Sequence, residues 1–115
     1  GYVEGEDLKS LLSETKLFVM PSLYEGFGMS VLEAMASKAP CLVSNIEPLK
    51  EVADGGAEFV NPYDVDGMAI KMEEMLDDKE KNRKMASQGH KIAKNFSWDK
   101  CARETLKIYK SFEEK

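Results

Sequence analysis

The chain has 115 residues, a formal net charge of −5, 43% hydrophobic residues and 32% charged residues. This length allows one domain with a modest core, and no apolar run approaches the roughly 20 residues that a membrane-spanning helix needs. The acidic balance argues against nucleic acid as a partner, because a protein that binds a phosphate backbone needs a basic surface.

The hydrophobic pattern predicts strands that alternate with helices. Apolar runs bounded by turn residues predict strands, and apolar residues at helical spacing predict helices. In chain order, the pattern predicts a helix over residues 7–14, a strand over 17–20, a helix over 28–37, a strand over 41–44, a short helix over 48–53, a strand over 58–60, a helix that Asp64 caps and that ends near Leu76, a helix over 79–94, and a last helix that starts at Ser97 or Asp99. This order predicts parallel strands joined by crossovers, in an α/β layered fold.

The same pattern predicts which residues are buried. The uninterrupted run Leu17–Met20 is typical of a strand buried on both faces. The two cysteines, Cys41 and Cys101, are expected to be buried structural thiols, and His90 is expected on the surface. The predicted inward residues of two helices are Val31, Leu32, Met35 and Ala36 in one, and Val65, Met68, Ala69, Met72, Met75 and Leu76 in the other.

The stretch from Leu17 to Lys38 reads as a strand, a glycine-bearing turn and a helix. The first amides of a helix have no internal partner and carry partial positive charge, and a glycine lets the backbone approach a phosphate closely. Gly26 and Gly28 lie at this turn, with Glu25 before them and Glu33 in the second turn of the helix. Carboxylates accept hydrogen bonds from hydroxyls. The arrangement suits a ligand with phosphate in its middle and polyols at both ends, such as a nucleotide-sugar.

The predicted sheet places this turn beside two other loops. In open parallel sheets, ligands bind beyond the carboxyl ends of the strands. The turn Pro21–Gly28 follows the first strand, so it must lie at that edge. The loops Ser44–Glu47 and Asn61–Asp64 follow the other two strands and are expected along the same edge.

The segment PSLYEGFGMSVLEAMA, residues 21–36, resembles the donor-binding signature of retaining glycosyltransferases of the GT-B fold, in the group 1 family. That signature has EGFG at its front, EAMA at its back and two glutamates separated by seven residues, the spacing of Glu25 and Glu33. Downstream, SNIEPLKEVADGGAEFVNPYDVDGMA and FSWDKCARETLKIY resemble the family's next strand, helix and strand and its closing helix. The resemblance implies part of a doubly wound, Rossmann-like parallel sheet with C-terminal helices.

The resemblance also implies roles for the residues of the turn. Glu25 would hydrogen-bond hydroxyls of the donor sugar and help stabilise the positive charge that develops as the glycosidic bond breaks, which makes it the candidate catalytic residue. Glu33 would bind the ribose of the nucleotide. The donor-binding residues would be Gly26, Phe27, Gly28, Met29, Ser30 and Glu33. The alternatives are an exposed loop carboxylate for Glu25, a solvated helix residue for Glu33, and a purely backbone role for the two glycines.

By resemblance, the chain is the donor-binding portion of a hexosyltransferase-type enzyme that uses a nucleotide diphosphate sugar and needs no metal or other cofactor. An N-terminal domain for the acceptor, a saccharide or a lipid-linked molecule, would lie outside this sequence, as would a basic pair that clamps the donor diphosphate. We therefore expect no catalysis by this chain alone. Glycoside hydrolysis uses two carboxylates, but the glycine turn between Glu25 and Glu33 favours phosphate binding. A non-catalytic nucleotide-binding or interaction module is the alternative.

The remaining expectations concern the surface. Lysines cluster between Lys79 and Lys110 with acids among them, which is typical of a solvated helix face, and contact with anionic lipid headgroups is the alternative.

Lys38 stands where the family often has glycine, so the helix before it ends differently or with strain. A sheet with missing strands leaves an unpaired edge, so we expect marginal stability or self-association. The expected location is the cytoplasm, with peripheral membrane contact of the full-length protein as an extension.

Overall fold

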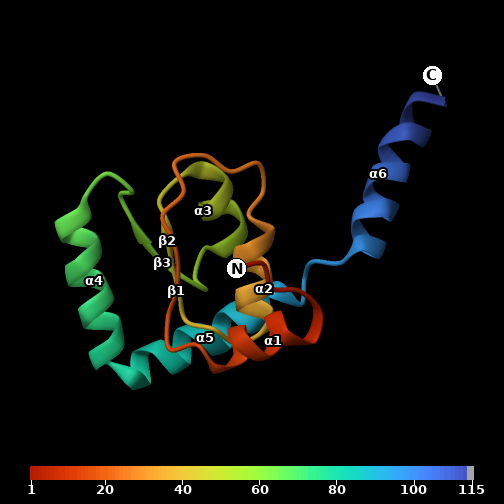
Figure 1. The fold of residues 1–115 in the computed structure, drawn as a ribbon. Helices are drawn as coiled ribbons and strands as arrows, with labels where there is room; N and C mark the ends of the chain where they lie inside the picture. Colours follow the sequence, from red (N-terminus) through yellow and green to blue (C-terminus); the bar gives the residue numbers. More distant parts are fainter. Residues whose placement is uncertain (114–115) are drawn as a thin grey trace.

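The computed structural model describes residues 1–113 and contains a three-stranded parallel sheet flanked by helices (Figure 1). The elements are α1 (Gly5–Glu14), β1 (Phe18–Met20), α2 (Met29–Ala36), β2 (Cys41–Ser44), α3 (Glu47–Ala53), β3 (Glu58–Val60), α4 (Val65–Asp77), α5 (Lys79–Ala93) and α6 (Trp98–Glu113). The predicted α/β class and the predicted order of strands and helices are confirmed. The main differences in bounds are at helix starts, since α1 begins at Gly5 and α3 at Glu47.

The sheet brings the ends of its strands to one edge. The strand order is β1-β2-β3, and both pairings are parallel. Met20 lies opposite Val43, and Ser44 lies opposite Val60, so the three carboxyl ends are level with one another. The loops that follow the strands therefore lie along the same edge, as predicted.

Alternating side chains of the strands form two clusters, because successive residues of a strand point to opposite faces of the sheet. On one face, Cys41 and Val43 of β2 pack with the buried side of α2 and with α3. On the other face, Leu42 packs with Val60 and with Met75 of α4. The first cluster is larger, so the sheet is covered more completely on the side of α2, α3 and α5 (Figure 1).

The prediction that β1 is buried on both faces is wrong. Every residue of β1 is half-buried, whereas every residue of β2 is buried. The reason is position, because β1 pairs with β2 on one side only and is an edge strand. A continuous apolar run does not distinguish an edge strand from a central one when both faces of the sheet carry helices.

The predicted inward faces of the helices need correction. In α2, the buried residues are Val31, Ala34 and Met35, and Ala36 is exposed because it lies about 100° around the helix from Met35. In α4, Met75 is buried and Met68 and Met72 are half-buried, whereas Val65 is 73% exposed. The helix α4 touches the sheet along a narrow stripe, so much of its predicted apolar face remains at the surface. Ala69 and Leu76 are also exposed.

The last helix, α6, projects from the rest of the molecule (Figure 1). No residue of α6 is buried within the part of the chain that the structure describes, and the molecule measures 56 × 31 × 30 Å. The predicted burial of Cys101 is therefore wrong, and Cys101 is exposed. The predicted burial of Cys41 is confirmed, and burial raises the pKa of its thiol to about 12.

His90 does more than occupy the surface. It is half-buried, and its Nδ1 atom lies 2.8 Å from the carbonyl oxygen of Ala36, which links α5 to the end of α2. Nearby, a Cβ on Gly89 would meet the carbonyl oxygen of Gly56 at 2.9 Å, so α5 lies very close to the backbone that precedes β3. The prediction of a plain surface histidine missed this close packing.

Lys38, two residues after the end of α2, adopts a left-handed conformation with φ of 61°. The amide of Ala39 donates to the carbonyl of Ala34 at 2.9 Å, and the amide of Lys38 donates to the carbonyl of Met35 at 3.0 Å. This is the hydrogen-bond pattern of a Schellman motif, whose left-handed position glycine usually occupies. Of the two predicted outcomes, the structure shows the strained one.

None of the helices within residues 1–113 combines the length and the apolar character required to cross a bilayer.

Candidate functional site

The candidate site lies where β1 leads into α2, at the carboxyl edge of the sheet. Gly28 takes a left-handed conformation with φ of 101° and precedes the first residue of α2. Its carbonyl oxygen accepts hydrogen bonds from the amides of Val31, at 3.1 Å, and Leu32, at 3.2 Å. Gly28 is thus the N-cap of α2, and the helix begins at Met29 rather than at residue 28 as predicted.

The two glycines of the turn have different surroundings. A Cβ on Gly28 would lie 2.6 Å from Cδ2 of Leu49, so the packing of α2 against α3 requires glycine here, in addition to the positive φ. A Cβ on Gly26 would meet no atom within 4 Å, and Gly26 is not among the residues with positive φ. A purely backbone role is therefore enough to explain why position 28 is glycine. Nothing in the described chain requires glycine at position 26.

The backbone amides at the start of α2 have no partner in the described chain. Among residues 1–113, none of the amides of Phe27, Gly28, Met29 and Ser30 donates a hydrogen bond to the protein. Gly28 is buried, but Ser30 is exposed, and Phe27 and Met29 are 43% and 44% exposed. A helix start with free amides carries partial positive charge and is suited to an anion.

Glu25 is held in the loop by a side-chain contact. It is half-buried, and the hydroxyl of Ser22 donates to its Oε1 atom at 2.9 Å. This bond restricts the carboxylate and leaves its second oxygen available to accept a hydroxyl of a ligand. The alternative of a freely exposed loop carboxylate does not describe this geometry.

Glu33 lies in a different setting. It is exposed and lines a groove of about 700 Å³ between α1 and α2, together with Gly5, Ser10 and Lys38. Glu25 is not among the residues that line this groove. None of residues 25–30 lines this groove, which follows the second half of α2 as far as Lys38, so the structure does not bring the two glutamates into one groove.

Two residues of the site were missed by sequence reasoning. The ring of Phe96 contacts the ring of Phe27 edge to face, with centroids 5.9 Å apart and an interplanar angle of 74°. Phe96 follows α5, so the chain near its end supports the turn at the start of α2. The other is Ser22, whose position three residues before Glu25 in a turn was the available signal for a side-chain hydrogen bond.

Comparison with known proteins places the chain in a family. Residues 1–92 match the family described as "Glycosyl transferases group 1". An Escherichia coli protein named O-antigen chain mannosyltransferase B is 38% identical over 110 residues, which cover 96% of this chain and 29% of that protein. A Mycolicibacterium hassiacum protein named MMP alpha-(1->4)-mannosyltransferase is 37% identical over 111 residues, which cover 93% of this chain and 27% of that protein. The chain thus spans less than a third of the length of these two relatives.

Solved structures agree with the sequence comparison. A sucrose-phosphate synthase from Thermosynechococcus elongatus superposes with a TM-score of 0.88 at 26% identity, over 99% of this chain and 29% of that chain. This similarity confirms the Rossmann-like GT-B arrangement that the sequence resemblance implied. With 92 residues matched to the family and the same fold in a solved relative, the chain belongs to the glycosyl transferases group 1 family.

Proposed function

We propose that this chain is the nucleotide-sugar-binding part of a retaining glycosyltransferase. The whole enzyme would transfer a hexose from a nucleotide diphosphate sugar to a saccharide or a lipid-linked acceptor. The observation that carries the proposal is the set of free amides at Phe27, Gly28, Met29 and Ser30, at the carboxyl edge of a parallel sheet. Such a helix start suits an anion. In a ligand that also carries two polyols, that anion is best explained as a diphosphate.

Each part of the donor has a partner in this proposal. The free amides receive the diphosphate and stabilise the negative charge that grows on it as the sugar leaves. The open space beside Gly26 lets the ligand approach the backbone. Glu25, oriented by Ser22, accepts hydroxyls of the donor sugar and stabilises positive charge at the anomeric carbon. Glu33 accepts the ribose hydroxyls from the groove along α2.

The rest of the reaction depends on residues that this chain does not contain. We propose that the basic pair for the diphosphate and the acceptor domain belong to the other part of a longer protein, so the chain alone binds donor without transferring sugar. Both cysteines are free, which suits the reducing cytoplasm as the place of the reaction. The relatives named mannosyltransferases make a mannose-bearing donor the first one to test.

The test is a titration of the isotope-labelled chain with GDP-mannose, UDP-glucose and ADP-glucose, followed through backbone amide resonances. We expect the largest shifts at residues 27–30, and we expect them to persist in EDTA because protein groups alone hold the donor. Glu33→Gln should weaken binding by about ten- to a hundredfold, since a hydrogen bond to a charged group contributes about 1.5–3 kcal/mol. The matched control is Glu73→Gln on α4, an exposed glutamate with no ion pair among the described residues.

Three outcomes contradict parts of this proposal. Equal affinity of the wild-type and Glu33→Gln chains would remove the ribose role of Glu33. Shifts that avoid residues 27–30 for all three donors would leave a non-catalytic module as the better account. Sugar transfer by the isolated chain would show that the catalytic groups are already complete here.

We also propose that the isolated chain self-associates through the free edge of β1. The three residues of this strand are half-buried, and its backbone pairs on one side only. The other edge strand, β3, also pairs on one side only, but its last residue, Val60, is buried, whereas no residue of β1 is. An unpaired strand edge is a template for a strand from another chain.

A further inference from the structure

A second groove opens at the opposite edge of the sheet from the candidate donor site. It has a volume of about 1180 Å³ and is lined by residues that precede β1 and β2 and by the first turns of α5. Thr15 and Lys16 come just before β1, and Lys38 and Pro40 come just before β2. Since the strands are parallel, this groove lies at their amino ends, away from Glu25 and from the free amides of α2.

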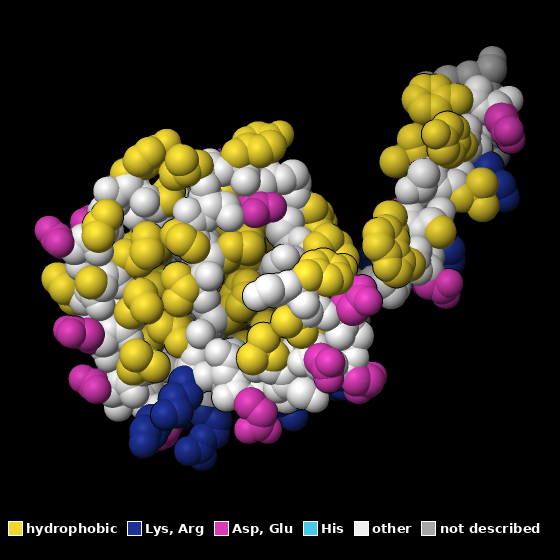
Figure 2. Space-filling model, in the orientation of Figure 1, with side chains coloured by type: hydrophobic (Ala, Val, Ile, Leu, Met, Phe, Trp, Pro, Cys, Tyr) yellow, Lys and Arg dark blue, Asp and Glu magenta, His cyan; other side chains and the backbone are white. Residues whose placement is uncertain are grey.

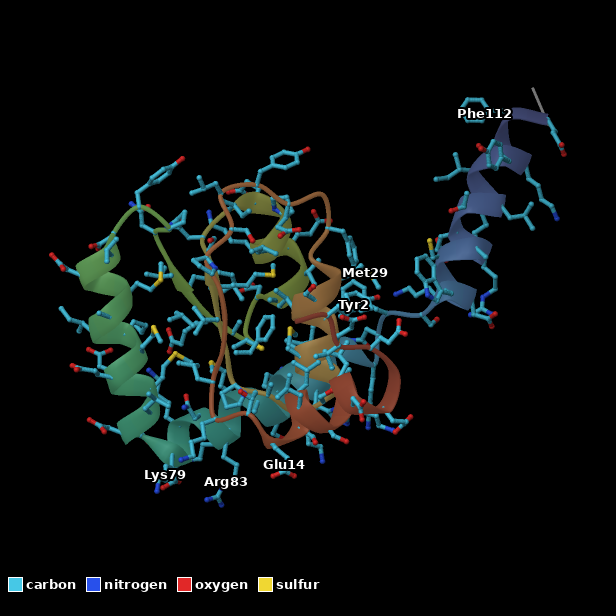
Figure 3. The ribbon with its side chains drawn as sticks, viewed as in Figure 1. Tyr2, Glu14, Met29, Lys79, Arg83 and Phe112 are labelled. Carbon is cyan, nitrogen blue, oxygen red and sulfur yellow. The ribbon has the colours of Figure 1, made fainter. Side chains whose placement is uncertain are left out.

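Most of the charged side chains in this groove, which we name the amino-edge groove, are cationic. Its charged lining residues are Lys16, Lys38, Lys79, Arg83, Lys84 and Glu80. Five cations against one acid give the lining a formal charge of +4, on a chain whose net charge is −5. Lys79 and Arg83 project together from the start of α5 (Figure 3), and basic side chains gather at that end of the molecule (Figure 2).

Most of these cations lack a partner. Within residues 1–113, Lys16, Lys38, Lys79 and Arg83 make no ion pair and no side-chain hydrogen bond, whereas Lys84 pairs with Glu80 at 2.8 Å. The cations that do have acidic partners are Lys9, Lys50, Lys71, Lys81, Lys84, Arg103 and Lys107. Like charges that converge without partners repel one another, and an anion between them would remove that cost.

The groove is fixed by tertiary packing. Asn82 is 7% exposed, lines the groove and donates from its side-chain amide to the carbonyl of Met75, which joins α5 to the end of α4. Lys38 lines the same groove from the left-handed position that ends α2. Three separate segments of the chain thus hold their cations around one concave surface. That surface suits an anion that contacts cations from all three segments at once.

We propose that the amino-edge groove binds a phosphate-bearing anion with two or more negative charges, such as a diphosphate or a triphosphate. The guanidinium of Arg83 offers paired donors for phosphate oxygens, and the lysines add mobile ammonium groups around it. This site shares Lys38 with the groove that Glu33 lines, but its other cations lie outside that groove, and it does not depend on the function proposed for α2.

The experiment uses the full chain and sodium tripolyphosphate at low ionic strength, with amide resonances and calorimetry as readouts. Shifts are expected at Lys16, Lys38 and residues 79–84. The double variant Lys79→Gln, Arg83→Gln should bind at least about tenfold more weakly, because two of the four unpaired cations are gone. The matched control is Lys91→Gln, Lys94→Gln, which removes the same charge from the other end of α5 and should change the affinity less than about twofold.

A second arm identifies the source of the phosphate. The chain is sedimented with vesicles of phosphatidylglycerol and, separately, of phosphatidylcholine. Binding to tripolyphosphate points to a free phosphate compound, and binding confined to the anionic vesicles points to a lipid headgroup. In either case, the Lys79, Arg83 variant must bind more weakly than the control. Absence of binding in both arms, equal loss in the two variants, or shifts confined to residues 27–30 would overturn the proposal.

Discussion

At the scale of single residues, the two glycines of the turn have different roles. The fold requires Gly28, whereas Gly26 leaves space that a ligand could occupy. Gly28 combines a positive φ with a Cβ position 2.6 Å from Leu49, so the chain itself excludes a side chain there. Gly26 has neither constraint. Its lack of a side chain therefore matters only to something that approaches from solvent.

This contrast predicts opposite behaviour of two alanine variants. Gly28→Ala should lower the free energy of unfolding by at least about 1–2 kcal/mol, because the left-handed backbone and Leu49 both oppose a Cβ. Gly26→Ala should leave stability within about 0.5 kcal/mol but weaken donor binding. Urea unfolding and the donor titration measure the two effects. Unchanged donor binding in Gly26→Ala would mean that the open space beside Gly26 has no part in the site.

The two thiols should differ in reactivity. Cys101 is exposed on α6, and Cys41 is buried in β2 with its pKa raised to about 12. A disulfide reagent at pH 8 should modify one thiol quickly, and Cys101→Ser should abolish that fast phase. The second thiol should react only as the chain unfolds. Fast modification of two thiols in the native protein would contradict the burial of β2.

The raised pKa of Cys41 also sets the direction of a pH effect. The ordinary value is 9.0, so between pH 9 and pH 12 the unfolded chain releases the thiol proton while the folded chain retains it. The folded chain then binds more protons, and stability falls as pH rises, by about 1.4 kcal/mol per pH unit for a single proton. Urea unfolding of wild-type and Cys41→Ala chains across this range should show a smaller decline in the variant.

At the scale of elements, the backbone just after α2 is strained at Lys38. The position of Lys38 in the amino-edge groove can explain why this strain is present. A left-handed conformation costs an L-residue roughly 1–2 kcal/mol, and Lys38 adopts one at φ of 61°. Its hydrogen bonds are those that a glycine would make. A cation is thus held beside the other cations of the amino-edge groove against the local backbone preference.

Lys38→Gly should therefore stabilise the chain while weakening phosphate binding. We expect the free energy of unfolding to rise by about 0.5–1 kcal/mol, since relief of strain exceeds the added entropy of the unfolded glycine. The control is Ser37→Gly, because Ser37 has φ of −85° and no left-handed strain to relieve. Urea unfolding compares the two variants, and a loss of stability in Lys38→Gly would show that the side chain contributes packing of its own.

At the scale of the whole molecule, two surfaces remain open to association. One is the edge of β1, whose backbone groups are unpaired, and the other is the apolar face of α6 that carries Trp98, Ile108 and Tyr109, which are 78%, 62% and 68% exposed. Apolar side chains on both the body and α6 are visible at the surface in Figure 2. Exposed apolar surface of this extent favours association.

A chain that ends at Ser97 distinguishes the two surfaces. Since no described residue of α6 is buried, the melting temperature should shift by less than about 4 °C, which corresponds to under about 0.5 kcal/mol. Sedimentation velocity should show the same self-association in the shortened and full chains if the edge of β1 carries it. A shortened chain that is monomeric at concentrations where the full chain associates would assign the association to α6 instead.

Local chemistry explains why so much of the architecture could be predicted. The run Cys41–Ser44 between turn residues and the cap at Asp64, whose side chain accepts from the amide of Gly67 at 2.9 Å, are short-range signals. The glycine turn and the spacing of Glu25 and Glu33 are equally local, and they led to the family that the comparisons show. The predictions of burial for β1 and Cys101 were wrong because burial depends on which other elements pack against a residue. No local sequence pattern contains that information.

By itself, the sequence determined the order of strands and helices, the helix start with its unpaired amides, and the family. These follow from side-chain periodicity, capping and glycine placement within a few residues of chain. Only the tertiary structure decided that Glu25 is restrained by Ser22 while Glu33 lines a separate groove, and that Lys16, Lys38, Lys79 and Arg83 converge. The reason is physical: the parallel crossovers bring distant segments to a common edge, and charges far apart along the chain become neighbours only when the sheet forms.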